Sequence, residues 1–76
     1  MKSLLETIVK PLIDNPHELH VREVLEDHSV TYLVTVHPDD MGKVIGKQGR
    51  IAKAIRTVVY AAGSQLDKKV YVKFDQ

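Results

Sequence analysis

The chain has 76 residues and no cysteine, and its 11 lysine and arginine residues nearly balance 10 acidic residues, giving a net charge of +1. A chain this short buries only about 60% of the surface that its unfolded form exposes, so we expect one domain over residues 1–76 without a deep active site. The lack of cysteine excludes disulfides and thiolate sites. Because no apolar run approaches membrane-spanning length and the start does not resemble a signal peptide, we expect a soluble, cytoplasmic protein.

The charges are unevenly distributed along the chain. Residues 1–40 contain eight acidic and three basic residues, residues 41–66 contain five basic and no acidic residues, and residues 67–76 contain three basic and two acidic residues. The three segments therefore sum to −5, +5 and +1. This distribution predicts one local basic surface of the kind that binds a polyanion, with an ordinary solvated helix as the alternative.

An amphipathic helix is predicted over residues 4–14. Ser3 and Glu6 form a capping-box pattern at its start. Pro11 lies inside the pattern and has no backbone N–H, which predicts a kink or an early end there. The Asn-Pro pair that follows then stops the helix. The apolar face repeats at helical spacing and consists of Leu4, Leu5, Ile8, Val9, Leu12 and Ile13.

Two strands are predicted next. Residues 17–29 fit both strand alternation and helical spacing, and the sequence leaves the two open. We predict a strand because the following segment needs a partner, with a bulge or phase change at Val24 and Leu25. Residues 30–37 alternate cleanly and are rich in β-branched residues. One face of this second strand consists of Val30, Tyr32, Val34 and Val36.

Two helices around a glycine turn follow. The Pro-Asp-Asp segment at residues 38–40 suits the first turn of a short helix, because proline fixes φ and acidic residues favour the positive end of the helix dipole. A loop joins Gly46 to Gly49, and a second helix runs over residues 49–62 until Gly63 stops it. The predicted buried side of the first helix consists of Met41, Val44 and Ile45, and the apolar residues of the second helix are Ile51, Ala52, Ile55, Val58, Val59 and Ala62.

A last amphipathic strand is predicted over residues 69–74. The order is therefore helix, strand, strand, helix, glycine loop, helix, strand. This order predicts an α+β fold with a three-stranded mixed sheet and helices on one face. In the last strand Val70, Val72 and Phe74 alternate with Lys69, Tyr71 and Lys73.

The loop between Gly46 and Gly49 is predicted to bind the backbone of a nucleic acid. Glycines allow positive φ angles and let phosphates approach the main chain closely. The amides after Gly49 open a helix, and a helix N-terminus favours anions. Five basic residues, Lys43, Lys47, Arg50, Lys53 and Arg56, add mobile positive charge around the loop.

These residues resemble a known family. The Val-Ile-Gly-Lys-Gln-Gly-Arg segment at residues 44–50 resembles the GXXG segment of KH RNA-binding domains, and the element order is similar to their type II, prokaryotic arrangement. The chain length, residues 9–12 (Val-Lys-Pro-Leu) and residues 55–60 (Ile-Arg-Thr-Val-Val-Tyr) resemble small bacterial proteins that consist of a single KH domain. The resemblance covers the whole chain.

The resemblance implies a noncatalytic protein that binds single-stranded RNA, with about four nucleotides of backbone held by the loop and bases lying on an aliphatic groove. Ala52 departs from the family pattern, which usually has a large aliphatic residue there. The groove is therefore expected to be shallower or to be completed by Ile51. By position, the resemblance assigns phosphate binding to the amides of Gly46, Lys47, Gln48 and Gly49, charge to Lys47 and Arg50, and the groove wall to Val44, Ile45 and Ile55.

The resemblance also implies a probable RNA chaperone linked to cell length and peptidoglycan homeostasis. It implies a homodimer, or a heterodimer with a larger protein that carries its own KH domain. Two RNA-binding grooves on one dimer would strengthen binding, because an RNA held by one groove is at a raised effective concentration for the other. The predicted pairing surface is the end of the second long helix, residues 57–62, with Val59 and Tyr60 as its contacts. The alternative is core packing for Val58 and Val59 with an isolated surface Tyr60. The sequence leaves two alternative functions open: a protein interaction module without direct RNA binding, and a single-stranded DNA binder.

Several catalytic and metal-binding classes are disfavoured. The P-loop pattern fails because only three residues separate Gly42 from the following Gly-Lys pair and no Ser or Thr follows. His17 and His20 could share one side of a turn with Glu18 adjacent in sequence, but no third metal ligand converges with the two histidines. An acylphosphatase-like enzyme is improbable because Asn15, far from the basic loop, is the only asparagine. We therefore predict no enzymatic activity, no cofactor and no small-molecule substrate.

Overall fold

A computed structural model of the chain describes residues 1–64 and 67–75. It has the predicted α+β class and the predicted order α-β-β-α-α-β. Short 3-10 turns at Lys10–Leu12, Pro16–Glu18, Pro38–Asp40 and Lys47–Gly49 join the main elements. These elements are α1 (Lys2–Val9), β1 (His20–Leu25), β2 (Ser29–Thr35), α2 (Met41–Ile45), α3 (Arg50–Ala62) and β3 (Lys69–Asp75).

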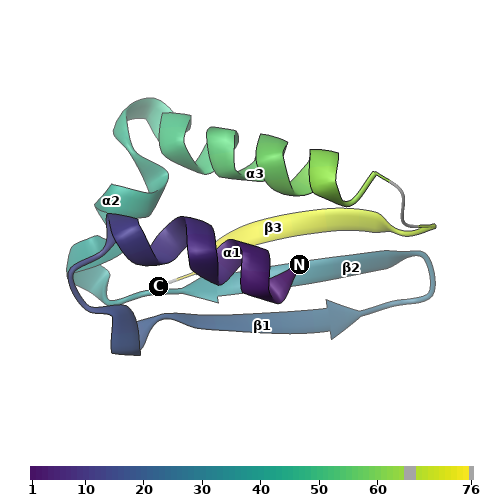
Figure 1. Cartoon of the computed structure of the whole chain (residues 1–76), viewed down its shortest axis with the longest axis horizontal. Helices are drawn as coiled ribbons and strands as arrows, with labels where there is room; N and C mark the ends of the chain where they lie inside the picture. Colours follow the sequence, from purple (N-terminus) through teal and green to yellow (C-terminus); the bar gives the residue numbers. More distant parts are fainter. Residues whose placement is uncertain (65–66, 76) are drawn as a thin grey trace.

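The strands form one mixed sheet in the order β1-β2-β3, and the helices lie on one of its faces (Figure 1). β1 is antiparallel to β2, whereas β3 is parallel to β2, with Val30 opposite Val70 and Val34 opposite Phe74. A parallel pair needs a long crossover, which α2 and α3 supply. The turn between these two helices consequently lies at one end of the molecule, away from the hairpin that joins β1 to β2 (Figure 1).

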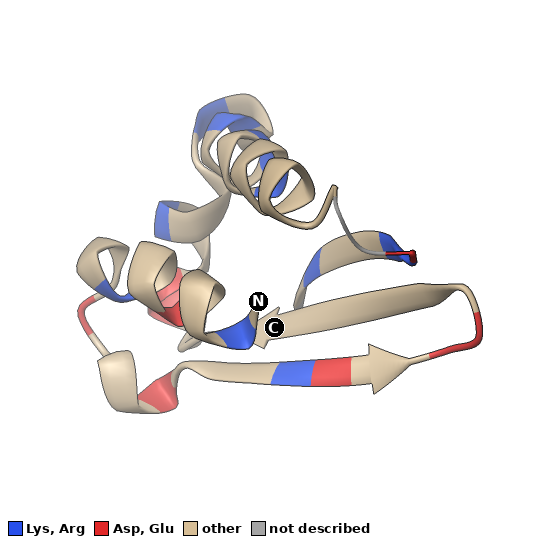
Figure 2. Cartoon of the chain, turned by 45° about the vertical axis from the view of Figure 1, so that its right-hand side comes forward, with Lys and Arg blue, Asp and Glu red and all other residues tan. Residues whose placement is uncertain are grey.

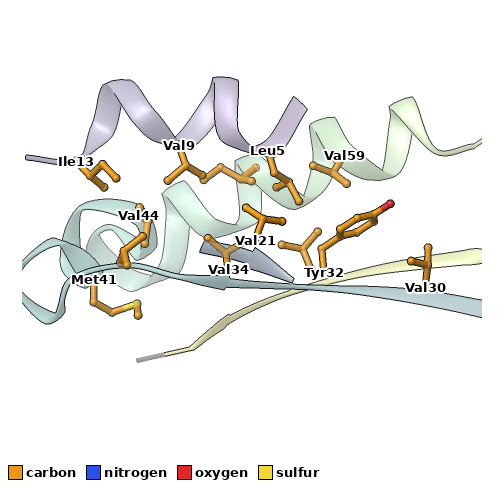
Figure 3. Close-up of a cluster of buried hydrophobic side chains, with 13 residues drawn as sticks. Leu5, Val9, Ile13, Val21, Val30, Tyr32, Val34, Met41, Val44 and Val59 are labelled. Carbon is orange, nitrogen blue, oxygen red and sulfur yellow. The ribbon is translucent and has the colours of Figure 1, made fainter. Parts of the chain in front are cut away.

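The predicted alternation of the central strand is confirmed. The side chains of Val30, Tyr32 and Val34 in β2 are at most 4% exposed and point toward the helices. The strand ends at Thr35, earlier than predicted, but Val36 beyond it is also buried in the core at 3% exposure. Residues from α1, α2 and α3 complete the core above the sheet (Figure 3). Its labelled members are Leu5, Val9, Ile13, Val21, Val30, Tyr32, Val34, Met41, Val44 and Val59.

The start of α1 differs from the prediction. The N-cap residue is Met1 and no side chain caps the helix, so the Ser3 and Glu6 capping box is wrong. Ser3 instead lies inside the helix, where its carbonyl accepts a hydrogen bond from the Thr7 hydroxyl. The early end at Pro11 is confirmed, because the α-helix stops at Val9 and a 3-10 turn follows.

The first strand is shorter than predicted. Residues 17–19 lie in a 3-10 turn and its exit rather than in β1, because Pro16 starts that turn. The predicted bulge at Val24 and Leu25 is wrong, since every residue of β1 pairs in unbroken register with β2. The adjacent apolar pair has a simpler cause: Val24 lies on the open face of the sheet, whereas Leu25 lies on the helix side but is 63% exposed.

Helix α3 ends at Gly63 as predicted, but the reason for glycine at this position is close packing and not a left-handed backbone. Gly63 caps the helix and its N–H donates to the Val59 carbonyl. Its φ is −89°, so no left-handed conformation is needed. A Cβ atom at this position would lie 2.9 Å from Cγ2 of Val70, so close packing between α3 and β3 favours glycine. Only part of the apolar pattern of α3 faces the core, because Ile51, Val58 and Ala62 are exposed.

Candidate nucleic-acid interface

The turn between α2 and α3 has an unusual backbone. Gly46 has φ 77° and ψ 176°, Gly49 has φ 74°, and Gln48 between them has φ 58°. The Gly46 combination is accessible essentially only to glycine, and a left-handed Gln48 costs about 1–3 kcal/mol. Strained backbone of this kind clusters at ligand-binding sites. The sequence predicted positive φ angles at both glycines, which is confirmed, but not at Gln48.

Two of the four loop amides are available to a ligand. The Gly46 N–H donates to the Gly42 carbonyl at 2.9 Å, and the Gly49 N–H donates to the Gly46 carbonyl at 3.2 Å. The amides of Lys47 and Gln48 have no intramolecular acceptor among residues 1–64 and 67–75, and both residues are exposed. The prediction that all four amides contact phosphate is therefore wrong for Gly46 and Gly49, which hold the turn itself.

The N-terminus of α3 is uncapped next to these amides. Its N-cap residue is Gly49, which has no side chain to accept a hydrogen bond, and its first turn contains no acidic residue. The positive end of the helix dipole therefore faces the loop without compensation from the helix's own side chains. Lys and Arg gather on α2, the loop and α3, whereas acidic residues lie mostly on other elements (Figure 2).

Three of the five predicted cations are free at this surface. Lys47, Arg50 and Lys53 are exposed, and none of them takes part in an ion pair within the described part of the chain. They lie on the loop and the first turn of α3. Their charges can therefore reach an anion bound at the Lys47 and Gln48 amides.

Lys43 is not free. Its ammonium group donates to the Asp14 carboxylate and lies 3.4 Å from Oδ1 of Asp40. Hydrogen bonding to Asp14, assisted by the charges of both carboxylates, raises the pKa of Lys43 although burial opposes the shift. The predicted role of Lys43 as mobile charge is therefore wrong: it ties α2 to the connection between α1 and β1.

Asp40 is the centre of this connection. The sequence predicted a first-turn acid, but the side chain is fully buried and accepts hydrogen bonds from Asp14 N–H at 3.2 Å, Asn15 N–H at 3.0 Å and Asn15 Nδ2 at 3.1 Å. Burial raises the pKa of the Asp40 carboxyl, but these hydrogen bonds and Lys43 outweigh it and hold the pKa below its ordinary value. Asp14 and Asn15 lie 26 and 25 residues from Asp40 in the sequence, so no local pattern predicts these hydrogen bonds.

Arg56 is also held in place. Its Nε donates to the Val72 carbonyl at 3.0 Å, and its Cζ lies 5.4 Å from the centre of the Phe74 ring. The prediction of a mobile charge is therefore wrong for this residue. Arg56 bridges α3 and β3.

The predicted groove residues divide into a core pair and a surface pair. Val44 and Ile55 are 0% and 3% exposed, so they support the surface from beneath. Ile45 is half-buried, and Ile51 is 36% exposed and packs against Gly46. Ala52, the residue that departs from the family pattern, is itself buried at 3% exposure. The apolar surface beside the loop therefore comes from Ile45 and Ile51.

The predicted pairing surface is only partly exposed. Val59 is 0% exposed and packs in the core, so it is wrong as a surface contact. Tyr60 is 42% exposed and Val58 is 49% exposed, so the alternative of core packing is wrong for Val58. These two large side chains are exposed in the second half of α3, together with Ala61 and Ala62.

Membrane-spanning helices and clusters of metal ligands are both absent from residues 1–64 and 67–75. None of the helices in residues 1–64 and 67–75 has the length and apolar character to cross a bilayer. No group of three potential metal ligands forms there, so His17 and His20 have no third ligand in this part of the chain.

Comparisons with known proteins agree on one family. The model of the KhpA/KhpB KH domain matches residues 2–74. The chain is 56% identical over 72 residues to a protein of Oceanobacillus iheyensis named RNA-binding protein KhpA, covering 95% of this chain and 96% of the relative. Proteins of the same name are 59% identical in Clostridium perfringens, over 96% of this chain and 97% of the relative, and 56% identical in Listeria monocytogenes, over 92% of each.

Proposed function

The chain belongs to the KhpA/KhpB family of KH domains, and we propose that it binds single-stranded RNA through residues 46–49. The observation that carries this proposal is the pair of unoccupied amides on Lys47 and Gln48, at an uncapped helix N-terminus. Peptide amides and a helix N-terminus together form an anion site. The curated relatives are named as RNA-binding proteins, which supports RNA as the anion.

In this proposal the RNA backbone binds at the loop and the bases bind beside it. One phosphate accepts hydrogen bonds from the two free amides, and Lys47, Arg50 and Lys53 attract its neighbours. Ile45 and Ile51 offer apolar contact to the bases, with Val44 and Ile55 supporting them from the core. No step of this function needs a catalytic group, in agreement with membership of a noncatalytic RNA-binding family.

We further propose that the working unit contains two KH domains. The family name pairs KhpA with KhpB, which supports a heterodimer with a larger KhpB-like protein beside a homodimer. Val58 and Tyr60 on α3 are the candidate contacts, since both are apolar and more than 40% exposed. Val58→Asp should then lower self-association in analytical ultracentrifugation, whereas Thr57→Asp on a neighbouring exposed position should lower it less. Equal loss in both variants would reject this surface.

The resemblance to small bacterial single-KH proteins supports a broader cellular role. We propose a cytoplasmic RNA chaperone linked to cell length and peptidoglycan homeostasis. A dimer that holds two RNA segments raises the effective concentration of each segment near the other. This gives a physical basis for annealing the two segments.

The loop assignment is tested by reversing its charge. Lys47→Asp combined with Gln48→Asp should abolish binding of a short single-stranded RNA, because two carboxylates would occupy the phosphate site. Lys2→Asp combined with Ser3→Asp changes the net charge equally on exposed positions of α1 and should retain binding. Circular dichroism must show that both variants are folded. Retained binding in the loop variant would reject the proposal.

The wild-type salt dependence separates the alternatives. Neutralising about three phosphates on a single strand predicts a slope near −2 in a plot of log affinity against log salt concentration. A protein interaction module would show no RNA binding to titrate. Equal affinity for DNA of the same sequence would favour a general single-strand binder.

A further inference from the structure

One face of the sheet is left uncovered by the fold. Helices α1, α2 and α3 all lie on the other face, where Val30, Tyr32 and Val34 of β2 belong to the core (Figure 1). Side chains alternate along a strand, so Thr31 and Leu33 point away from the helices. No helix or strand of residues 1–64 and 67–75 packs over them (Figure 1). We call this surface the open face of the sheet.

The strand register brings residues from all three strands together on the open face. Arg22 of β1 lies opposite Leu33 of β2, and Leu33 lies opposite Lys73 of β3. The main chains of Arg22 and Lys73 are therefore two strand spacings, or about 10 Å, apart. The two central rows of the open face are Arg22, Leu33 and Lys73, and next to them Val24, Thr31 and Tyr71.

The two cations of these rows have no counterion. Arg22 and Lys73 are exposed, and neither forms an ion pair within the part of the chain that the structure describes. Pairs of opposite charge on facing strands stabilise a sheet, but both cations here face the same neutral Leu33. Glu23, the residue after Arg22, lies on the helix side and accepts a hydrogen bond from the Tyr32 hydroxyl. The centre of the open face is therefore basic.

Acidic residues occur only beyond the two central rows of this face. Glu26 follows β1 at the hairpin, where its N–H donates to the Ser29 carbonyl. Asp75 is the last residue of β3 and pairs with Thr35 in the register, at the opposite end of the sheet. The position of these acids limits a bound polyanion to the middle of the sheet.

Tyr71 adds an exposed aromatic ring beside the cations. Its side chain is 43% exposed, and the half-buried Val24 and Leu33 extend an apolar strip next to it. Aromatic side chains on a sheet stack RNA bases in other RNA-binding modules, and every base has a face that can stack. An acidic peptide offers charge to the cations but no base to the ring. The combination therefore fits a nucleotide chain better than an acidic protein segment.

We propose that the open face of the sheet is a second RNA contact site, at which phosphates lie near Arg22 and Lys73 and a base stacks on Tyr71. This inference rests on the proposed function, since the same RNA is held first by the loop at residues 46–49. The loop belongs to the helix layer (Figure 1), so only an RNA that continues around the edge of the sheet reaches both sites. The open face then acts on a segment whose effective concentration the loop has already raised.

RNA length separates the two sites. Hexauridine is long enough for the loop, which holds about four nucleotides, whereas an oligouridine of about twenty nucleotides reaches both sites. Arg22→Gln combined with Lys73→Gln should leave the affinity for hexauridine unchanged and weaken binding of the long RNA. The salt slope for the long RNA should become less negative by about 1.4, since each neutralised phosphate contributes about 0.7. Fluorescence anisotropy measures both affinities.

Two further variants complete the comparison. Tyr71→Thr keeps a residue that favours strands and should weaken binding of the long RNA by about 5-fold or more, the lower end of the effect of one stacked base. Lys2→Gln combined with Lys10→Gln removes the same charge from exposed positions at the two ends of the first helical segment and should leave binding of the long RNA nearly unchanged. The pairing residues on α3 are intact in all these variants, and thermal melting checks that each one is folded.

Methyl NMR of the wild type tests the site without any substitution. The long RNA should shift the methyl resonances of Leu33, on the open face, more than those of Val34, which is 0% exposed on the other side of the same strand. Hexauridine should not shift the Leu33 resonances. An oligoglutamate of the same length as the long RNA tests an acidic protein segment as the occupant.

The outcomes distinguish this inference from the proposed function. Unchanged binding of the long RNA in both open-face variants would overturn the inference, and so would an equal loss for the long RNA and hexauridine. Leu33 shifts as large with oligoglutamate as with RNA would also overturn it. A wild type that binds neither RNA would instead reject the proposed function, and this inference with it.

Discussion

Ile51 packs so closely on Gly46 that a Cβ atom added to the glycine would lie 2.6 Å from Cγ1 and 3.0 Å from Cβ of Ile51. Real Cβ atoms do not approach other carbons this closely, and the contacted atoms are near the main chain of α3, where they cannot move freely. The first turn of α3 and the conformation of the loop therefore depend on each other.

Gly46→Ala should disrupt both stability and RNA binding. The added Cβ would clash with Ile51, and alanine disfavours the positive φ of this position. Together these effects should lower the free energy of unfolding, measured with urea, by about 1–3 kcal/mol. RNA affinity should fall in the same variant, because the Lys47 and Gln48 amides move with the loop.

Gly42→Ala is the matched control for this substitution. Gly42 lies in α2 without a positive φ, and nothing lies within 4 Å of an added Cβ. Alanine there should raise stability by about 0.5–1 kcal/mol, since glycine disfavours a helix interior. If the two alanine variants had equal stability, the contact between Gly46 and Ile51 would have no energetic role.

Neutralising Lys43 and neutralising Lys47 should have different effects on RNA binding and on stability. Lys47→Gln removes a free cation at the loop, so the salt slope of RNA binding should become less negative by about 0.7. Lys43→Gln should leave that slope unchanged and lower the melting temperature instead, because Asp14 and Asp40 lose their cationic partner. Fluorescence anisotropy at several salt concentrations checks the first effect and thermal melting checks the second. A change of slope with Lys43→Gln would mean that RNA draws this lysine away from its carboxylates.

The local features of this chain were predictable because local chemistry determines them. Val30 and Val34 were placed on the buried face of β2 because side chains alternate along a strand. The positive φ angles of Gly46 and Gly49 followed from two glycines between helical patterns. Both inferences need only neighbouring residues, which a single sequence displays in full.

The failures concern partners that are distant in sequence. Lys43 and Arg56 look like free surface cations until the fold brings Asp14 and Val72 to them. The helical pattern of the sequence allows Val59 to lie on either the buried or the exposed side of α3. Only the packing of α3 on the sheet shows that Val59 is buried. The site was therefore predictable as a loop, whereas the division of its basic residues into free and engaged ones was not.

Asp40→Asn should destabilise the fold far more than Asp39→Asn. Both oxygens of the Asp40 carboxylate accept hydrogen bonds, so an amide would place an NH₂ group against N–H donors from Asp14 or Asn15. A buried donor without an acceptor is costly. The neighbouring Asp39 side chain is 86% exposed and offers a control with the same change of charge. Thermal unfolding followed by circular dichroism compares the two.

The same carboxylate predicts an acid dependence. The pKa of Asp40 is lower in the folded protein than its ordinary value of 3.8, so its ionised form favours the folded state. This contribution is fully present above that ordinary value and is lost as the pH falls through the lower pKa of the folded state. Asp40→Asn should therefore lose less stability between neutral pH and about pH 2 than the wild type does. Parallel acid curves for the two proteins would contradict this role.

Tyr32 should make the protein sensitive to alkali. Its side chain is 4% exposed, and its hydroxyl donates to Oε2 of Glu23 at 2.9 Å. Burial, together with the hydrogen bond to Glu23 and the charge of that carboxylate, raises the pKa of Tyr32 from 10.0 to about 12. Because the folded state favours the neutral phenol, its contribution is fully present below pH 10.0 and is lost as the pH rises toward about 12.

Tyr32→Phe separates this effect from other alkaline titrations. Lys43, whose pKa is also raised, loses its stabilising charge at high pH in both proteins, so only the difference between them reports Tyr32. At neutral pH the variant should lose about 0.5–1.5 kcal/mol, the net value of one hydrogen bond, because the exposed Glu23 can bond to water instead. Urea unfolding between neutral pH and the alkaline limit should then show a smaller loss in Tyr32→Phe than in the wild type. If both proteins lost stability equally over that interval, the phenol would not be the group that titrates.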